Sequence, residues 1–337
     1  MTLQERKNAL IALGERLQQI SNEELAQLTL RTINENNWFN EANVSRALTA
    51  WAQALSTEEI TTWTKEFEKT TPSVARVGLI MAGNIPLVGL HDLITVLVSG
   101  HRAVVKLSSQ DTVLMQFIIR ELLHIAPAFE KQIEVVEQLK DIDAVIATGS
   151  DNTARYFKQY FGNKPHIIRQ NRTSIAILNG QESTETLHEL GKDIFTYYGL
   201  GCRNVAKVFL PKDADITNLI DGLMGYEEVL THHKYLNNYD YNKSIYLVNG
   251  EPHLDSGFFL MRETEELVSP ISVLYYERYD NEAQLALRLA TFADKTQCMV
   301  SDQAWYPNSI NFGAAQSPEL WDYADGVNTL DFLAKLS

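Results

Sequence analysis

Residues Val74–Ser109, VARVGLIMAGNIPLVGLHDLITVLVSGHRAVVKLSS, decide the fold class of this chain. Two short apolar runs flank a longer apolar stretch whose length suits a helix, and turn residues separate the three pieces. Pro86 suits the first turn of the helix, and Gly100 suits its carboxyl-terminal cap. The segment therefore predicts a strand, a helix and a second strand, which together form one unit of a parallel sheet. These elements are expected at residues 74–81, 87–98 and 103–107.

The same alternation continues along the chain. Further strands are expected at Ile133–Val136, Ala144–Ala147 and Ser174–Leu178, with helices at Thr112–Ile125 and Asn152–Phe161. Alternating strands and helices predict an α/β fold with a doubly wound parallel sheet, in which ligands bind at the carboxyl ends of the strands. Ahead of this sheet, Ser21 and Ser56 each precede a glutamate at capping-box spacing, so about the first seventy residues are expected to be helical.

A second α/β section is expected after Gly180. It contains a helix from Thr184 to about Tyr198, a helix at Glu282–Phe292, and strands near Val205–Leu210, Ser244–Val248, Val268–Tyr276 and Cys298–Ser301. A chain of 337 residues usually divides into about two domains. We therefore expect one domain at residues 1–180 and a second at 181–337, with a boundary that is uncertain by about ten residues.

The composition excludes several classes of protein. With 45% hydrophobic and 21% charged residues, the chain is typical of soluble globular proteins and not of disordered or fibrous ones. The most apolar stretch, Val77–Val98, is interrupted by Asn84 and Asp92, so it predicts a buried strand and helix and no membrane insertion. A net charge of −14 argues against nucleic acid and anionic membranes as partners. The eight histidines lack metal-site spacing, so no metal is expected.

Cys202 is the candidate nucleophile. It lies in Tyr198–Asn204, YGLGCRN, between a helix and a strand, and the glycines before it permit a sharp turn and close approach of a substrate. An isolated cysteine is more often a buried core residue, and Cys298 is expected to be one. Two cysteines cannot form a disulfide framework, and a reducing compartment suits a reactive thiol, so a cytoplasmic location is expected.

Two turns that follow predicted strands carry polar groups that an enzyme can use. The side-chain amide of Asn84 can donate to a developing oxyanion, although asparagine is also common in ordinary turns. At the end of the next strand, Lys106, Ser108 and Ser109 can hold a ribose or a phosphate, or the lysine can simply be solvated.

A third turn, Thr148–Asn152, follows a strand and opens a helix. Its amides and hydroxyls can hold a pyrophosphate, or Ser150 or Asn152 can simply cap the helix. The chain has no GxGxxG or Walker sequence, so a nucleotide site must be of a less usual kind. The polar aromatic run His233–Tyr241 either lines a ligand entrance or forms a hydrogen-bonded loop on the core.

Taken in order, these segments resemble the aldehyde dehydrogenase superfamily and, within it, the acyl-CoA reductases of the bacterial luminescence type. Gly83–Leu87 resembles the superfamily's WNFPL segment, whose asparagine helps to form the oxyanion hole, and this implies that role for Asn84. Gly199–Cys202 resembles its GQxC segment and implies that Cys202 is the catalytic nucleophile. The tail residues Asp322–Val327 resemble the carboxyl terminus of the luminescence-type reductases.

The remaining matches imply a site for a nicotinamide cofactor. Val105–Ser109 resembles LKPSE, which binds the adenosine ribose, and Ala147–Ser150 resembles FTGS, which lies near the pyrophosphate. Glu265–Pro270 resembles EEIFGP, whose second glutamate holds the nicotinamide ribose. The cofactor-binding residues that the resemblance implies are Lys106, Ser108, Ser109, Thr148, Gly149, Ser150 and Glu266.

The resemblance also implies an architecture and an activity. Residues 1–180 would form a helical amino-terminal segment and a doubly wound cofactor domain, and residues 181–337 a smaller α/β domain with the catalytic thiol, whose tail returns to the cofactor domain. The implied activity is reduction of an acyl-CoA or other acyl thioester to an aldehyde, through an acyl-cysteine and hydride from NAD(P)H. The alternatives are an oxidative aldehyde dehydrogenase and a non-catalytic nucleotide- or acyl-binding protein. The superfamily generally associates, which leaves a homo-oligomer open.

Departures from the superfamily pattern refine this expectation. Arg169 stands where hydrolytic members have a glutamate, so a base that activates water is missing there and an acyl-enzyme should persist. Ser109 replaces the glutamate of LKPSE and removes a charge that would repel a 2′-phosphate, which favours NADPH without excluding NADH. Ala154 replaces a glycine near the cofactor turn. Arg203 or Arg169 is expected to lower the pKa of the thiol if it faces the site.

Overall fold

The computed structural model describes residues 1–67 and 73–336. Contacts divide the chain into two compact units, which are described separately below. The first unit is formed by Met1–Asn171 together with the carboxyl-terminal segment from Glu319, and the second by Arg172–Pro318. Within the described residues, no helix combines the length and the apolar character that crossing a membrane requires.

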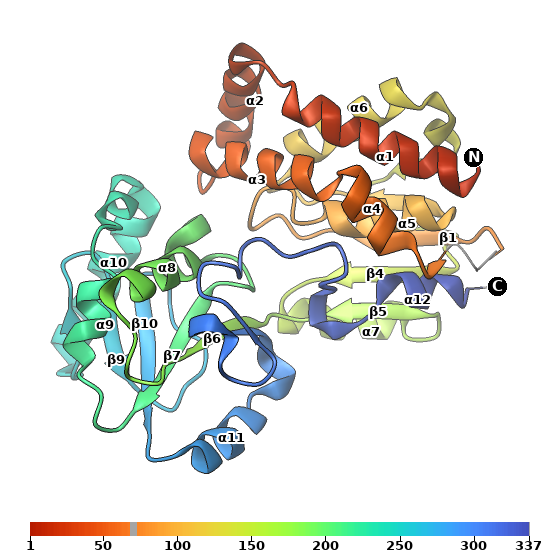
Figure 1. The fold of residues 1–337 in the computed structure, drawn as a ribbon. Helices are drawn as coiled ribbons and strands as arrows, with labels where there is room; N and C mark the ends of the chain where they lie inside the picture. The colour runs from red at the N-terminus through yellow and green to blue at the C-terminus, as the bar shows by residue number, and fades with distance from the viewer. Residues whose placement is uncertain (68–72, 337) are drawn as a thin grey trace. The chain divides into compact units, whose positions relative to one another are not determined.

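The first unit is built on a five-stranded sheet in which every strand is parallel to its neighbours. Its strands are β1 (Arg76–Ile80), β2 (Arg102–Lys106), β3 (Ile133–Val135), β4 (Ala144–Thr148) and β5 (His166–Arg169). The spatial order is β3-β2-β1-β4-β5, so the chain starts at the centre, winds to one edge and then returns to the other. Figure 1 shows β1, β4 and β5 in this order. This arrangement confirms the expected doubly wound parallel sheet.

The helices that connect these strands follow the expected order. They are α5 (Leu90–Ser99), α6 (Thr112–Ile125) and α7 (Asp151–Phe161). Gly100 caps α5 with a φ of 86°, a left-handed conformation that glycine adopts without a steric penalty. The expected start of α5 at residue 87 is wrong by three residues, because Leu87 has a φ of 58° and belongs to the preceding turn.

Helices from both ends of the chain complete the first unit. The amino-terminal helices are α1 (Leu3–Gln18), α2 (Asn22–Glu35), α3 (Glu41–Ala54) and α4 (Thr57–Thr64). The hydroxyls of Ser21 and Ser56 accept the expected hydrogen bonds at the starts of α2 and α4. From the other end, α12 (Thr329–Ala334) packs on α5, and its Leu330 and Leu333 join the core of this unit.

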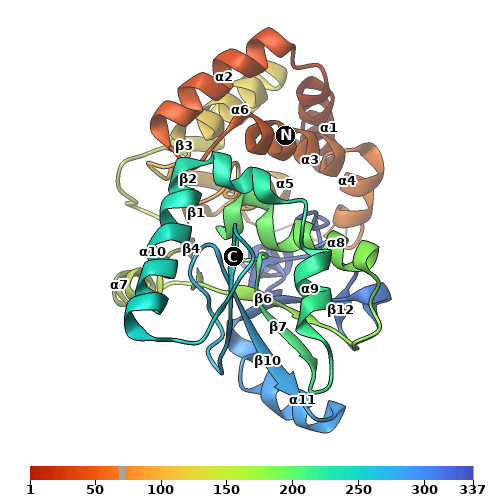
Figure 2. The same ribbon diagram turned by 90° about the vertical axis from the view of Figure 1, so that its left-hand side faces the viewer.

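The second unit is built on a seven-stranded sheet (Figure 2). Its strands are β6 (Thr173–Ile177), β7 (Val205–Pro211), β8 (Leu254–Asp255), β9 (Leu260–Glu263), β10 (Val273–Tyr279), β11 (Thr296–Ser301) and β12 (Ser309–Ile310). The order is β12-β11-β6-β7-β10-β9-β8, and every pairing is parallel except that of β8 with β9.

The helices of the second unit are α8 (Thr184–Phe195), α9 (Ile216–Gly222), α10 (His233–Asn249) and α11 (Glu282–Ala290). Short 3-10 helices in the two units are η2 (Pro127–Lys131), η3 (Thr196–Gly199), η4 (Glu227–Thr231), η5 (Ala293–Lys295), η6 (Asp302–Ala304) and η7 (Ala324–Gly326). The expected helix up to Tyr198 therefore stops at Phe195, where the backbone changes direction.

Strand β6 determines where the two units separate. It pairs with β7 and β11 of the second sheet, so the contacts divide the chain after Asn171, within about ten residues of the boundary expected near Gly180. The strand expected at 174–178 is present, but it is the first strand of the second sheet and not the last of the first. The sequence did not predict the preceding strand β5, because only two apolar residues lie between its ends, His166 and Arg169.

Two expectations for the second unit are wrong. The strand expected at Ser244–Val248 is the last part of α10. The strand expected at Val268–Tyr276 begins only at Val273, as β10. A separate strand, β9, precedes it in the sequence. The run His233–Tyr241 is the first half of α10 and not a loop. The buried residues of α10 follow helical spacing, since Tyr235, Tyr239, Asn242 and Tyr246 are four, three and four positions apart.

Candidate active site

Cys202 is exposed on the short loop between η3 and β7. Three successive residues before it have left-handed φ values, which are 54° at Tyr197, 58° at Tyr198 and 80° at Gly199. Such values are unfavourable for tyrosine and persist only where the surroundings hold them. Both tyrosines are buried, and the ring centroid of Tyr198 lies 4.3 Å from that of His232. Packing of these rings therefore holds the turn that presents Cys202.

Asn204 fixes the backbone on the carboxyl side of the cysteine. Its Nδ2 group donates to the carbonyls of Asp193 at 3.0 Å, Ile194 at 3.2 Å and Thr196 at 2.8 Å. Its Oδ1 atom accepts from the amide of Gly201 at 2.8 Å. The side chain is buried and satisfies the carbonyls that the end of α8 leaves open. The cysteine loop is thus tied to a helix and a strand at once.

Ser174, on β6, holds the cysteine loop from the other side. Its hydroxyl donates to the carbonyl of Cys202 at 3.1 Å and accepts from the amide of Cys298 at 3.2 Å. The Sγ atom of Cys298 lies 3.0 Å from the same oxygen, and because the serine proton is already donated, the thiol is the donor there. Cys298 is half-buried and is more than a passive core thiol, since it supports the residue that holds Cys202.

The two arginines expected near the thiol have other partners. The Nε atom of Arg203 donates to the carbonyl of Ala315. In the first unit, Nη1 of Arg169 donates to both carboxylate oxygens of Asp92, at 2.8 and 2.7 Å, and Nη2 donates to Thr329 at 3.2 Å. The charge of Arg169 is compensated by this buried pair.

Asp193, at the end of α8, links the cysteine region to the segment before residue 318. Its carboxylate accepts from the amides of Gly313 at 2.7 Å and Ala315 at 2.9 Å. Burial raises the pKa of Asp193 from its ordinary 3.8 to about 6, against the opposing effects of these amides and of Arg203. The negative charge of Glu189 adds to this rise, so the carboxyl group of Asp193 titrates near pH 6 and not near its ordinary value.

Asn84 and the serines after β2 lie together at the carboxyl edge of the first sheet. Asn84 is half-buried in the turn after β1, and Lys106, which ends β2, is exposed. A Cβ atom on Gly83 would lie 2.4 Å from the hydroxyl oxygen of Ser108, so only glycine permits this approach. The neighbouring turn is fixed by Asp111, whose carboxylate accepts from the amide of Leu87 at 2.7 Å.

The turn after β4 occupies the same edge, because β4 pairs with β1 in register. The hydroxyl of Ser150 caps α7 by accepting from the amide of Thr153 at 3.3 Å, which is one of the two interpretations of this segment. The amide of Gly149 donates to the carbonyl of Arg169 at 3.2 Å. A Cβ atom on Gly149 would lie 3.0 Å from both Thr153 and Phe157, so the turn is tightly packed.

Glu266 belongs to the second unit, as does Cys202. It is exposed on the loop between β9 and β10, and its amide donates to the hydroxyl of Thr264 at 3.2 Å. The hydroxyl of Tyr275 donates to its carboxylate at 3.4 Å. The expected site residues therefore form two groups, one in each unit. The first unit carries Asn84, Lys106, Ser108, Ser109, Thr148, Gly149 and Ser150, and the second carries Cys202 and Glu266.

Sequence reasoning missed the residues that hold these groups. The sequence assigns no role to Asn204, Ser174 or Asp193. The sequence does show an asparagine two residues after the candidate nucleophile, but not that its side chain is buried. The contacts of Ser174 and Asp193 span more than a hundred residues to Cys298 and Gly313, so no local pattern reveals them.

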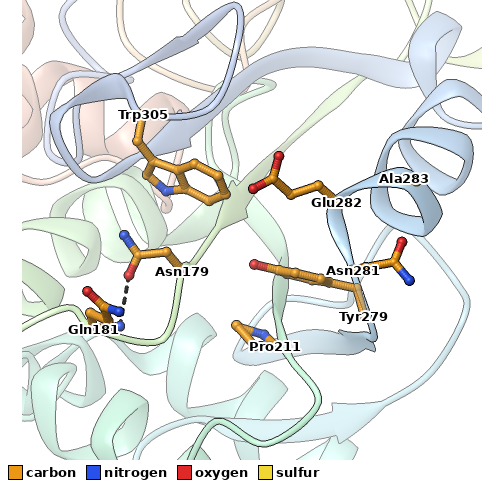
Figure 3. Close-up of a pocket in the computed structure, with 8 residues that line it drawn as sticks. All are labelled: Asn179, Gln181, Pro211, Tyr279, Asn281, Glu282, Ala283 and Trp305. Atoms are coloured by element: carbon orange, nitrogen blue, oxygen red, sulfur yellow. Dashed lines mark hydrogen bonds between the residues drawn. The ribbon is translucent and has the colours of Figure 1, made fainter.

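A cavity of about 710 Å³ lies elsewhere in the second unit (Figure 3). It is lined by Asn179, Gln181, Pro211, Tyr279, Asn281, Glu282, Ala283 and Trp305. Pro211 ends β7, whereas Cys202 precedes it, so the length of this strand, roughly 20 Å, separates cysteine and cavity. None of the expected site residues lines this cavity. Within residues 1–67 and 73–336, no group of three or more metal-binding side chains was found.

Comparison with protein families identifies the relatives of this chain. The family model described as acyl-CoA reductase (LuxC) matches residues 7–220, which is more than half of the chain. The chain belongs to this family. The match covers the whole parallel sheet of the first unit and, in the second, β6, α8, the Cys202 loop and β7. A search among curated proteins found no match.

Solved structures show that this LuxC-family chain has an aldehyde dehydrogenase-like fold. The indole-3-acetaldehyde dehydrogenase AldA of P. syringae, solved with NAD⁺ and IAA, has a TM-score of 0.67 at 15% identity, and covers 92% of this chain and 74% of its own. An NAD⁺ complex of an aldehyde dehydrogenase from Bacillus cereus has a TM-score of 0.63 at 17% identity, covering 89% of this chain and 72% of its own. Family and fold together indicate an enzyme of the acyl-CoA reductase and aldehyde dehydrogenase type.

Proposed function

We propose that this protein reduces an acyl-CoA or a similar acyl thioester to an aldehyde, with Cys202 as the nucleophile. The observation that carries the proposal is an exposed cysteine on a loop held by Asn204 and Ser174, in a chain of the acyl-CoA reductase family. A nucleophile needs access to substrate and a fixed position, and this loop supplies both. The proposed direction is reductive, and oxidation of an aldehyde is the alternative.

The chemistry begins with the Cys202 thiolate. Its sulfur attacks the carbonyl carbon of the thioester and forms a tetrahedral oxyanion, which collapses to an acyl-cysteine as the thiolate of the donor, such as CoA, leaves and takes up a proton. A bound NAD(P)H would supply the hydride that reduces the acyl group. The resulting thiohemiacetal loses its proton, releases the aldehyde and returns Cys202 as the thiolate.

Two donors are proposed for the oxyanion, the side-chain amide of Asn84 and the backbone N–H of Cys202. One such donor is typically worth about 3 kcal/mol, which is roughly a hundredfold or more in rate. Asn84 is half-buried in a turn that Gly83 and Asp111 hold in place, so its amide need not become ordered during the reaction. Pre-organised donors of this kind stabilise the transition state more than the ground state.

The residues of the first unit fit a dinucleotide. Lys106, the Ser108–Ser109 pair and the Thr148–Ser150 turn all lie at the carboxyl edge of a doubly wound sheet, where such folds bind their ligands. The start of α7 follows directly and favours a phosphate group. Glu266 would hold the nicotinamide ribose. The NAD⁺ complexes of similar structures support a nicotinamide cofactor, and Ser109 in place of a glutamate favours NADPH over NADH.

Arg169 supports the reductive direction. Where hydrolytic relatives are expected to carry a general base, this chain has a guanidinium that pairs with Asp92 inside the first unit. Without a carboxylate there, water is not activated and the acyl-cysteine persists until hydride arrives. We further propose a cytoplasmic location, because neither cysteine forms a disulfide and a reactive thiol suits a reducing compartment. The proposed division of labour assigns the adenosine ribose and pyrophosphate of the cofactor to the first unit, and the thiol and the nicotinamide ribose to the second.

The test is a single-turnover experiment monitored by mass spectrometry of the intact protein. The protein is mixed with a panel of acyl-CoAs and then with NADPH or NADH. We expect an acyl adduct on Cys202 that disappears as aldehyde appears after addition of reduced cofactor. Cys202→Ala should form no adduct, whereas Cys298→Ala should still form one, because Cys298 only supports Ser174. Absence of an adduct with every acyl-CoA, or an adduct that survives in Cys202→Ala, would contradict the proposal.

A further inference from the structure

The loop that carries Glu266 is held by a buried lysine. Lys207, on β7, has a fully buried side chain, and its Nζ atom donates to the carbonyls of Thr264 at 2.7 Å and Glu266 at 3.0 Å. The third N–H donates to the carboxylate of Glu277, on β10, at 2.5 Å. A lysine ammonium has three protons, so these three acceptors satisfy it completely.

Arg288, on α11, completes the same arrangement. Its Nη2 atom donates to the carbonyl of Glu265, and its Nε atom donates to Glu277 at 2.7 Å. The three successive carbonyls of residues 264–266 thus each accept a hydrogen bond from a cation, and the carboxylate of Glu277 joins the two cations. Hydrogen bonds with an ionised donor are roughly twice as strong as neutral ones, so this loop is held unusually firmly.

Aromatic rings surround the two cations. The ring centroid of Phe292 lies 5.4 Å from Nζ of Lys207 and 4.5 Å from the guanidinium carbon of Arg288. The ring centroid of Phe209, which lies on the same strand as Lys207, is 5.2 Å from Nζ of Lys207. Burial lowers the pKa of Lys207, and the opposing effect of Glu277 favours its charged form. A buried charge costs free energy, so a structure that needed only stability would be served as well by apolar residues here.

We propose that Lys207 and Arg288, joined by Glu277, are positioning residues for Glu266 in hydride transfer. The proposal rests on the proposed function. Lys207 binds the carbonyl of Glu266 itself, while Tyr275 and Thr264 orient its side chain and amide, so the carboxylate is presented at a fixed place. Attack of Cys202 on the thioester does not involve Glu266, whereas delivery of hydride requires a fixed nicotinamide ribose. We call Lys207, Arg288 and Glu277 the clamp of the Glu266 loop. Loss of the clamp should therefore slow hydride transfer and leave acylation of Cys202 unchanged.

The test compares Lys207→Met, Arg288→Gln and Arg288→Lys with the control Lys243→Met. Lys243 belongs to the same unit and pairs with Asp255 at 2.6 Å and with Tyr239. It lies far from the Glu266 loop in the sequence, and neither of these partners belongs to that loop. The rates of acylation of Cys202 and of aldehyde formation are measured separately by quenched mass spectrometry. In addition, hydrogen–deuterium exchange of the peptide that spans residues 264–267 is followed without any ligand.

In Lys207→Met and Arg288→Gln, we expect acylation within about twofold of wild type and hydride transfer slower by about tenfold. Exchange at residues 264–267 should rise, and Arg288→Lys should restore part of both effects because it keeps one cation. Unchanged exchange, or equal losses in both steps, would overturn the proposal. If Lys207→Met does not fold, the more exposed Arg288 decides the question. Wild-type protein that forms no acyl adduct would contradict the proposed function instead, while the exchange measurement would still test the clamp.

Discussion

At the scale of single residues, Asn204 links stability to presentation of the thiol. One side-chain amide accounts for three carbonyls at the end of α8 and for the amide of Gly201. Tyr197 and Tyr198, which precede the cysteine loop, have unfavourable φ values that only a well-ordered loop maintains. The cost of the strained turn is thus offset by hydrogen bonds made one or two residues away from Cys202.

We expect Asn204→Ala to lower the free energy of unfolding by about 2 to 4 kcal/mol, because several buried carbonyls lose their donor. Acylation of Cys202 should slow as well, since the loop can then leave its strained conformation. Urea unfolding and the single-turnover acylation rate measure the two effects. The control is Asn281→Ala, which removes the amino-terminal cap of α11 and should cost only about 1 kcal/mol. Equal losses in the two variants would show that Asn204 is an ordinary cap.

At the scale of elements, Asp193 connects α8 to the segment around Gly313 and Ala315. The pKa of Asp193 is about 6 in the folded protein and an ordinary 3.8 in the unfolded chain. Between about pH 4 and 6, the carboxyl group therefore keeps its proton only when the protein is folded. Unfolding therefore releases a proton in this window, and stability falls as the pH rises from about 4 to 6. Below the window, the group contributes no pH dependence.

We expect Asp193→Asn to remove this part of the pH dependence. Two pKa units correspond to about 3 kcal/mol at most, so the slope should be measurable in urea unfolding at pH 4.5, 5.5 and 6.5. Asn cannot ionise and its carbonyl oxygen can still accept one of the two amides. The variant should lose less stability than wild type over this range. An identical slope in wild type and variant would mean that another group causes it.

At the scale of the whole molecule, the chain leaves the first unit after Asn171 and returns to it at Glu319. The returning segment contributes Thr329 to the Asp92–Arg169 pair and Leu333 to the core. The second unit is therefore an insertion in the sequence of the first. This explains how a residue near the carboxyl terminus can support a sheet whose strands all lie before residue 170.

We expect Leu333→Ala to destabilise the first unit by about 3 kcal/mol, because Leu333 is fully buried on the returning helix. Lys335→Ala, in the same turn of the chain but exposed, should change the free energy of unfolding by less than about 0.5 kcal/mol. Thermal unfolding followed by tryptophan fluorescence compares the variants. Similar midpoints for both would argue that the tail adds nothing to the core.

Short sequence patterns correctly predicted the features that depend on neighbouring residues, namely several strands and helix caps. The apolar runs of β1, β2 and β4 and the caps at Ser21, Ser56 and Gly100 all lie where the sequence placed them. Tertiary pairing decided the rest. Strand β6 looks like a continuation of the first sheet until its partners are known, and α10 shows few apolar residues because its buried face is made of tyrosines.

The candidate site divides in the same way. Cys202, Asn84 and the turns after β2 and β4 could be proposed because each follows a strand or a helix in a short recognisable segment. The residues that hold them could not, since Ser174 reaches Cys298 and Lys207 reaches Thr264 only after the sheet has formed. A buried lysine in an apolar strand carries no sign in the sequence of which carbonyls it will bind.

The return of the chain from Glu319 has a consequence for biosynthesis. A ribosome makes the amino-terminal helices and the whole first sheet early, yet the helix that covers α5 and the threonine that binds Arg169 emerge last. Until then, nascent protein exposes the apolar surface that α12 will cover, while the second unit already has all of its own strands. We expect the growing chain to depend on chaperones during this interval, and the second unit to become resistant to protease before the first.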